Sequence, residues 1–154
     1  MKLIKKYNNI ELIIEENILN EMGNLGIEHY PNEFGGFLIG KYSSDFKTLF
    51  IENYILPKIY KGFPFYFERS IEGIRVAFKN LFSKKNLYYI GEWHTHPGGS
   101  TKFSQTDLIA MIKTVECETV KIENPILLII SVDKQKMSDY TFYFYENKKL
   151  KPYE

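Results

Sequence analysis

Hydrophobic positions recur with two different periods along the chain, which predicts strands and helices in turn. An apolar run at Ile10–Ile14 predicts a short strand. A first helix should follow it, because the next apolar residues fall at helical spacing: Ile18, Leu19, Met22 and Leu25. Gly26 stands where such a helix would end. The β-rich runs Gly35–Tyr42 and Lys47–Leu56 flank the turn-like Ser43–Asp45 and predict an antiparallel hairpin.

The second half of the chain continues this alternation. A second helix is predicted with Ser70 as its N-cap and a core-directed apolar face made of Ile71, Ile74, Ala77, Phe78, Leu81 and Phe82. Leu87–Trp93 reads as a buried strand, and a third helix should begin near Gln105. Two final strands are expected at Ile126–Val132 and Tyr140–Tyr145. The pattern therefore predicts an α/β (α+β) fold, with a mixed central sheet flanked by helices.

Length and composition favour one compact domain over residues 1–154. The chain has 44% hydrophobic residues and a net charge of +1, with no internal repeat or linker-like tract. This even charge balance argues against nucleic acid or a membrane surface as partner. Lys148, Lys149 and Lys151 are interpreted as a solvated end. A lone cysteine, Cys117, fits a reducing compartment, and no apolar run approaches the roughly 20 residues of a membrane span, so a cytoplasmic protein is expected.

Two of the three histidines lie two residues apart at the end of the predicted buried strand. Because side chains alternate along a strand, His94 and His96 should face the same side, about 6–7 Å apart at the backbone. Two imidazoles at this separation can close around one metal ion, although histidines at sheet edges and in cores are also common. The pair alone therefore does not decide between a metal site and a structural role.

A carboxylate follows the histidines at the start of the third helix. Ser104 and Asp107 have the spacing of a capping box, which needs no metal. Asp107 also adjoins the apolar face of the helix, so its carboxylate would point toward the histidines if that face packs on their strand. Two imidazoles and one carboxylate suit Zn²⁺ and leave a fourth position for water, as in catalytic zinc sites. The cap and the metal site can coexist.

These residues carry a resemblance to a known family. His94-Thr95-His96-Pro97, followed by Ser104 and Asp107, resembles the JAMM signature H-[ST]-H-P-x6-S-x2-D of the JAB/MPN zinc metalloproteases. Glu33 and the residues after it look like the family's upstream segment E-x-x-G-x-L-x-G. The order of predicted elements is similar to the compact MPN core, and Gly91-Glu92-Trp93 looks most like the prokaryotic, deubiquitinase-like branch found in CBASS-type anti-phage operons.

The resemblance implies a function and a role for each site residue. His94, His96 and Asp107 would bind one zinc ion with its water, Glu33 would move the proton, and Ser104 would stabilise the oxyanion. The implied reaction is hydrolysis of the peptide or isopeptide bond after the C-terminus of a ubiquitin-like protein, acting on conjugates or precursors. Two alternatives stay open: maturation of a sulfur-carrier protein, and a metal-free MPN scaffold.

Several other residues have side chains that could serve a function. Glu92 should face the same side of the strand as the two histidines. It is interpreted at best as a hydrogen-bond partner that orients an imidazole, or as a buried acid paired with a cation or hydroxyl. Cys117 is expected to be a buried structural cysteine, and His29 a surface loop residue. The short connection Asp133–Asp139 leaves no room for a long insertion. An aromatic cluster fits either a substrate groove or strand packing: Tyr60, Phe63, Phe65, Tyr66 and Phe67.

Overall fold

The computed structural model describes residues 1–117 and 122–154. Over these residues the chain forms, in order, β1 (Lys2–Tyr7), β2 (Ile10–Glu15), α1 (Glu16–His29), β3 (Gly35–Tyr42), β4 (Thr48–Ile55), β5 (Ile59–Phe63), β6 (Tyr66–Ser70), α2 (Arg75–Lys85), β7 (Tyr88–Pro97), α3 (Gln105–Glu116), β8 (Ile126–Val132), β9 (Met137–Glu146) and β10 (Lys149–Pro152). None of the described helices is long and apolar enough to cross a membrane.

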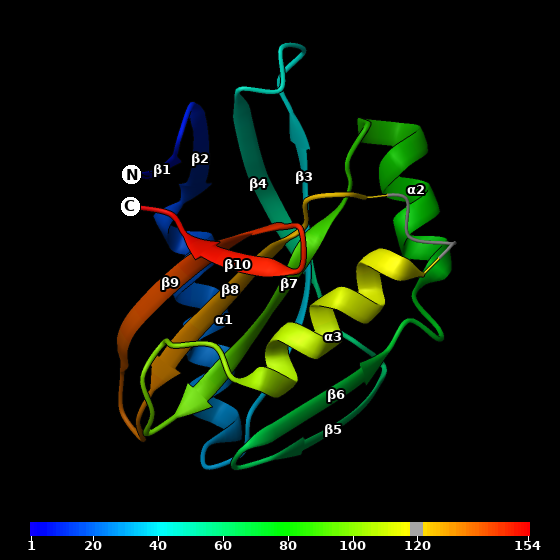
Figure 1. Ribbon diagram of the computed structural model, residues 1–154. Coiled ribbons are helices and arrows are strands. Elements are labelled where there is room, and N and C mark those ends of the chain that lie inside the picture. The colour runs from blue at the N-terminus through cyan, green and yellow to red at the C-terminus, as the bar shows by residue number, and fades with distance from the viewer. Residues whose placement is uncertain (118–121) are drawn as a thin grey trace.

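Eight strands form one mixed sheet, in the order β1-β2-β4-β3-β7-β8-β9-β10. The pairs β2–β4 and β7–β8 are parallel, and the other neighbouring pairs are antiparallel. Figure 1 shows α1 behind this sheet, with α3 and the separate hairpin β5–β6 in front of it. The expected fold, a mixed central sheet flanked by helices, is confirmed.

Strand β8 shows why the sheet needs helices on both faces. Every residue of Ile126–Val132 is buried. Because neighbouring side chains point to opposite faces, Leu128 joins the core cluster that includes Met22 of α1, whereas Ile129 joins the cluster that includes Met111 of α3. An uninterrupted apolar run is the pattern expected for a strand covered on both sides. The central strands are therefore the most firmly held part of the fold.

The two edges of the sheet approach each other beside the chain termini (Figure 1). The amide of Lys6 donates to the carbonyl of Glu154 at 2.7 Å, and the amide of Glu154 donates back to Lys6 at 2.8 Å. The ring of Tyr7 stacks on Phe144 with centroids 4.7 Å apart. The lysines of this end are exposed as expected, but Lys149–Pro152 forms strand β10 where a loose end was expected.

Helix α1 corrects the expectation that Gly26 ends the first helix, because the helix continues to His29. A Cβ at Gly26 would lie 2.3 Å from Cγ2 of Thr95. The glycine is thus required by the close packing of α1 against β7. Sequence alone does not distinguish a glycine that ends a helix from one that allows close approach.

Helix α2 corrects the expectation of a core-directed face. The helix begins at Arg75 with Ile74 as its N-cap, and none of its residues is buried. Ser70, the expected cap, instead ends strand β6. Phe82 is 59% exposed, although Ile74 just before the helix is buried. The apolar stripe that predicted the helix faces a groove, described below.

Candidate metal centre

Strand β7 places the two histidines at one end of the central sheet. It runs between β3 and β8 and extends to Pro97, beyond the predicted end at Trp93. His94 is buried. Its Nε2 atom lies 3.2 Å from Nε2 of His96, so the two rings converge as their spacing predicted.

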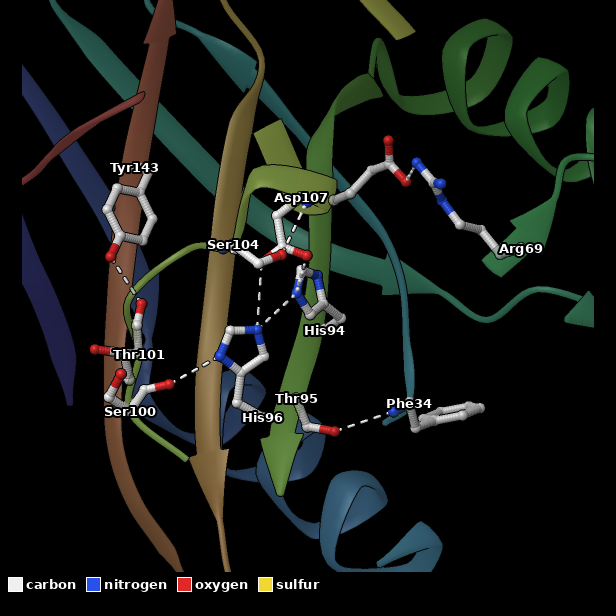
Figure 2. Close-up of polar contacts among 11 residues, drawn as sticks. Phe34, Arg69, His94, Thr95, His96, Ser100, Thr101, Ser104, Asp107 and Tyr143 are labelled. Atoms are coloured by element: carbon white, nitrogen blue, oxygen red, sulfur yellow. Dashed lines mark hydrogen bonds and ion pairs between the residues drawn. The ribbon is translucent and has the colours of Figure 1, made fainter. Parts of the chain in front are cut away.

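Helix α3 brings Asp107 to the histidines. Its Oδ1 lies 3.2 Å from Nε2 of His94 and its Oδ2 lies 3.3 Å from Nε2 of His96. Figure 2 shows the three side chains meeting between β7 and the start of α3. The capping box is also present, because the amide of Asp107 donates to Oγ of Ser104 at 3.1 Å and the amide of Ser104 donates to Oδ2 of Asp107 at 2.8 Å. The capping box therefore coexists with the approach of Asp107 to the two histidines.

The geometry of this triad fits a tetrahedral metal. Ligand atoms about 2.0–2.2 Å from a zinc ion stand about 3.3–3.5 Å apart at tetrahedral angles, which is close to the separations among His94, His96 and Asp107. The Nδ1 atom of His96 donates to the carbonyl of Ser100 at 2.8 Å, since a carbonyl can only accept. In the neutral ring this leaves Nε2 unprotonated and facing the other two ligand atoms.

Glu33 reaches the same place from the loop before β3. Strand β3 pairs with β7 so that Gly35 lies opposite His94, and a Cβ at Gly35 would meet the backbone of Trp93 at 2.1 Å. This close approach leaves Glu33 across from His96, 7% exposed. Among the described residues, ligand atoms of Glu33, His94 and His96 all lie within 4.8 Å of one another. Two carboxylates thus flank the histidine pair.

The two carboxylates differ in their protonation behaviour. Burial raises the pKa of Glu33 to about 7; the nearby charge of His96 lowers it and that of Asp107 raises it further. Burial also opposes ionisation of Asp107, yet its hydrogen bonds with His94 and His96 hold the pKa of that carboxyl well below its usual range. Asp107 is therefore a permanent anion, whereas Glu33 can gain and lose a proton near neutral pH.

The pKa of His96 reflects its hydrogen bonds. Burial opposes the charged ring, but the bonds to Asp107 and to the Ser100 carbonyl raise the pKa of His96 above its usual value. Without a metal, the triad thus favours a protonated imidazole against an ionised carboxylate. A metal cation bound between the imidazole and the carboxylate would take the place of the imidazole proton.

Thr95 is a site residue that sequence reasoning missed. It is fully buried, its Oγ1 accepts from the amide of Phe34 at 3.0 Å, and its own amide donates to the carbonyl of Phe34 at 2.8 Å. These bonds fix the residue next to Glu33 onto the histidine strand (Figure 2). The available signal was its place between the two histidines, which turns its side chain toward α1.

Glu92 does not contact the histidines in any described interaction. Its carboxylate pairs with Arg69 of β6 and accepts from the hydroxyls of Tyr89 at 3.0 Å and Thr114 at 3.3 Å. The interpretation as a buried acid paired with a cation and hydroxyls is thus confirmed, and the one as an orienting partner of an imidazole has no contact to support it. Arg69 had not been singled out, because its partner lies 23 residues away in sequence.

Two other expectations are wrong. Cys117 is exposed at the C-terminal cap of α3 and is not a buried core residue. His29 is the last residue of α1, where its ring stacks on Phe34 with centroids 3.8 Å apart. Its Nδ1 donates to the carbonyl of Leu25 at 2.8 Å, and its Nε2 lies 3.4 Å from the hydroxyl of Tyr60. Aromatic stacking, which depends on the fold, draws His29 inward.

A groove leads away from the metal centre along the front of the sheet. It begins at Glu33, His94 and Asp107 and continues between two walls. One wall is β6 with the turn before it and α2, and the other is α3. These elements are labelled in Figure 1. Its apolar lining includes Phe65, Tyr66, Phe67, Ile71, Phe78, Phe82 and Ile109. This accounts for the apolar faces that neither the hairpin nor α2 buries in the core.

Comparison with known proteins agrees with this geometry. Residues 15–143 match the family described as prokaryotic homologues of the JAB domain. The chain belongs to this family. Among curated proteins, this JAB protein is similar to the CD-NTase/cGAS isopeptidase of Enterobacter hormaechei subsp. hoffmannii (strain UCI 50), with 31% identity over 123 residues, which is 79% of this chain and 68% of the relative.

Solved structures share the fold of this JAB protein. The solution structure of protein DSY2949 from Desulfitobacterium hafniense matches with a TM-score of 0.65 and 19% identity, covering 90% of this chain and 87% of that one. A solution structure from Salinibacter ruber matches with a TM-score of 0.59 and 19% identity, covering 90% and 86%. At this identity the similarity concerns the fold alone.

Proposed function

We propose that this protein is a zinc-dependent isopeptidase that hydrolyses the peptide or isopeptide bond after the C-terminus of a ubiquitin-like protein, in bacterial anti-phage defence. The observation that carries the proposal is the convergence of two carboxylates, Glu33 and Asp107, on the side chains of His94 and His96. A relative named an isopeptidase acting in the CD-NTase/cGAS context supports the same reaction class.

His94, His96 and Asp107 would hold the zinc ion. Two imidazoles and one carboxylate leave one tetrahedral position open, which is the arrangement of catalytic rather than structural zinc sites. Bound there, zinc would polarise the scissile carbonyl and lower the pKa of a water toward about 7. The permanent charge of Asp107 suits a ligand, because a carboxyl that stays ionised does not release the metal when pH falls moderately.

Glu33 would be the general base and acid. Its pKa of about 7 lets it take a proton from the attacking water and return it to the leaving amine. A general base works best near neutral pH when its pKa lies in this range. Its backbone is held on two sides: its amide donates to the carbonyl of Phe63 at 2.9 Å, and its neighbour Phe34 is bonded to Thr95. The carboxylate is thus placed by the fold before substrate arrives.

Ser104 would donate a hydrogen bond to the tetrahedral oxyanion. Its Oγ accepts from the amide of Asp107, which leaves the hydroxyl proton available, and the residue is exposed at the open side of the site. A hydroxyl aimed at the developing charge stabilises the transition state more than the ground state.

The groove would receive the extended C-terminal tail of the modifier. It leads to the metal centre and is walled by exposed aromatic side chains, among them Phe65, which is 92% exposed, and Tyr66, which is 40% exposed. Exposed apolar surface of this kind is characteristic of binding sites. The short turn between β8 and β9 offers no second insertion over the site.

The test compares conjugates in cells that carry the protein natively, either as wild type or as Glu33→Ala. Lysine remnants left on target proteins after proteolysis are quantified by mass spectrometry. We expect remnants of one ubiquitin-like modifier to accumulate in the Glu33→Ala cells, with zinc still bound to the purified variant. Glu28→Ala, at an exposed position of α1, is the matched control and should leave conjugates unchanged. Equal conjugate levels in wild-type and Glu33→Ala cells would contradict the proposal and favour sulfur-carrier maturation or a scaffold.

A further inference from the structure

The cluster around Glu92 joins three elements that border the groove. Glu92 lies on the histidine strand β7, two residues before His94, and its side chain is 6% exposed. Its carboxylate pairs with Arg69 of the hairpin and accepts from Thr114 of α3. A third donor, the hydroxyl of Tyr89, lies on β7 itself. One carboxylate therefore connects the floor of the groove to both of its walls.

Helix α3 contacts β7 at two points through the same face. Asp107 meets His94 near the start of the helix, and Thr114 meets Glu92 two turns later. Seven residues of helix span about 10 Å, so these contacts fix the direction of the helix across the strand as well as its distance. The single hydroxyl proton of Thr114 is shared between the Glu92 carboxylate at 3.3 Å and the carbonyl of Ala110, one turn back, at 3.0 Å.

Two polar contacts attach the hairpin β5–β6 to its surroundings, beside the packing of Tyr60 and Phe67 on the ring of Phe34. Near its tip, the carbonyl of Phe63 accepts from the amide of Glu33, and a Cβ at Gly62 would lie 2.3 Å from the Glu33 carbonyl. Arg69, three residues along β6 from the tip residue Tyr66, makes the second attachment through Glu92. Between these two points the hairpin presents its exposed aromatic residues to the groove.

The Arg69–Glu92 pair is an unusual choice for stability alone. A buried ion pair gains little over apolar residues of similar volume, because both charges must leave water. A guanidinium on a carboxylate does supply direction, since its N–H groups form a rigid planar fork. In this pair Nη2 of Arg69 meets Oε1 of Glu92, while Oε2 accepts from Tyr89 and Thr114. A purely apolar contact would let the hairpin slide along β7.

We infer that Arg69 and Glu92 are positioning residues of the isopeptidase reaction, which hold hairpin β5–β6 at a set distance from α3 and thereby keep the groove open for the substrate tail. This rests on the proposed function. The pair touches neither the metal ligands nor Glu33, and the Phe34–Thr95 bonds hold Glu33 independently of it. Loss of the pair is therefore expected to weaken substrate binding much more than turnover.

The test uses the double variant R69M/E92Q. Methionine removes the cation at similar length, and glutamine keeps an oxygen that accepts from Tyr89 and Thr114, so no buried charge is left unpaired and α3 keeps its bond. The matched control is K148M/E116Q, which removes the exposed pair between the β9–β10 turn and the end of α3, with side chains 70% and 61% exposed. R69K is a second variant, which keeps the charge without the fork.

Two measurements are made on the zinc-loaded proteins. The first is hydrogen–deuterium exchange, in which the amides of residues 59–70 and of Glu33 should exchange about tenfold faster in R69M/E92Q than in wild type. In R69K the same amides should exchange about two- to threefold faster. The amides of β8 in both variants, and all amides of K148M/E116Q, should exchange as in wild type. With the conjugate purified from the Glu33→Ala cells as substrate, KM should rise about tenfold while kcat changes less than about threefold.

Unchanged exchange over residues 59–70 in both variants would overturn the inference, and so would faster exchange with an unchanged KM. If R69M/E92Q does not fold, R69K carries the same comparison. The exchange measurement needs no catalysis, so it tests the positioning role even if the proposed function fails. Failure of the proposed function would instead be seen as equal conjugate levels in wild-type and Glu33→Ala cells.

Discussion

The candidate metal centre and the outer wall of the groove differ in how many of their side chains find partners within the protein. At the metal centre, Glu33 and His94 are buried, and the polar atoms of Asp107 have partners on β7 and at the start of α3. Along the hairpin β5–β6 and helix α2, large apolar side chains face solvent: Phe65 is 92% exposed and Phe82 59%.

This difference separates chemistry from recognition. Groups that react must be held in place beforehand, because reorganising them during the reaction would raise its barrier. Groups that recognise an extended chain keep their apolar surface exposed until the partner covers it. Substitutions at the metal centre should therefore affect metal binding and turnover, and substitutions on the hairpin should affect KM.

The largest effect is expected for Asp107→Ala, which should abolish both zinc binding and turnover. The substitution removes one proposed metal ligand and the acceptor that faces both imidazoles. Zinc content by atomic spectroscopy and kcat measure the two losses. Asp133→Ala is the matched control, since Asp133 likewise accepts backbone amide bonds, from Gln135 and Lys136, but at an exposed turn. Full zinc occupancy in Asp107→Ala would remove Asp107 from the ligand set.

Ser104→Ala should lower kcat about 10²–10³-fold with zinc retained, the loss seen when an oxyanion donor is removed. The same substitution also removes the N-cap of α3, at about 1 kcal/mol of stability. Ser104→Gly separates the two roles, because glycine at an N-cap costs only about a few tenths of a kcal/mol while still lacking the hydroxyl. Equal loss of kcat in both variants is expected. A Ser104→Gly enzyme with wild-type kcat would leave Ser104 as a cap alone.

The raised pKa of Glu33 predicts a pH dependence of stability in the zinc-free protein. With a pKa of about 7 in the folded state against 4.5 as its ordinary value, the folded protein holds a proton that the unfolded chain lacks between these two pH values. The free energy of unfolding therefore falls as pH rises from about 4.5 to about 7, by up to about 3 kcal/mol. Glu33→Gln cannot titrate and should lack this fall.

Urea unfolding of both proteins in the presence of a chelator, from pH 4.5 to 8, measures the effect. The stability of Glu33→Gln relative to wild type should increase across the interval and level off above it. The charge of Glu33 also raises the pKa of His96, so the difference between the two profiles measures Glu33 together with its coupling to His96. Parallel profiles would show that Glu33 ionises at its ordinary pH.

The elements that were predictable from sequence are those buried on both faces. The runs Gly35–Tyr42 and Ile126–Val132 form β3 and β8 with the predicted bounds, and α3 begins at Gln105 as expected. Their hydrophobic pattern alone specifies a covered strand or an amphipathic helix. The convergence of His94, His96 and Asp107 followed from strand parity and the position of a helix start.

Other features depend on contacts between residues distant in sequence. Strands β1, β5, β6 and β10 were not predicted, because edge and hairpin strands carry many lysines or exposed aromatics and form only through pairing. Glu33 could be chosen only by resemblance, since its place across from His96 depends on the register of β3 on β7. The stripe on α2 was assigned to the core because periodicity does not distinguish a core from a groove.

The smallest effect is expected on the recognition side, for Phe65→Ala. Its ring is 92% exposed, so the substitution should leave the free energy of unfolding within about 0.5 kcal/mol of wild type. If the ring is covered when substrate binds, losing part of its apolar burial should raise KM about five- to tenfold with kcat unchanged. Ile4→Ala, an exposed apolar position on edge strand β1 and outside the groove, should change neither quantity. A loss in kcat with unchanged KM for Phe65→Ala would contradict the division between chemistry and recognition, because it would place a recognition residue in the chemical step.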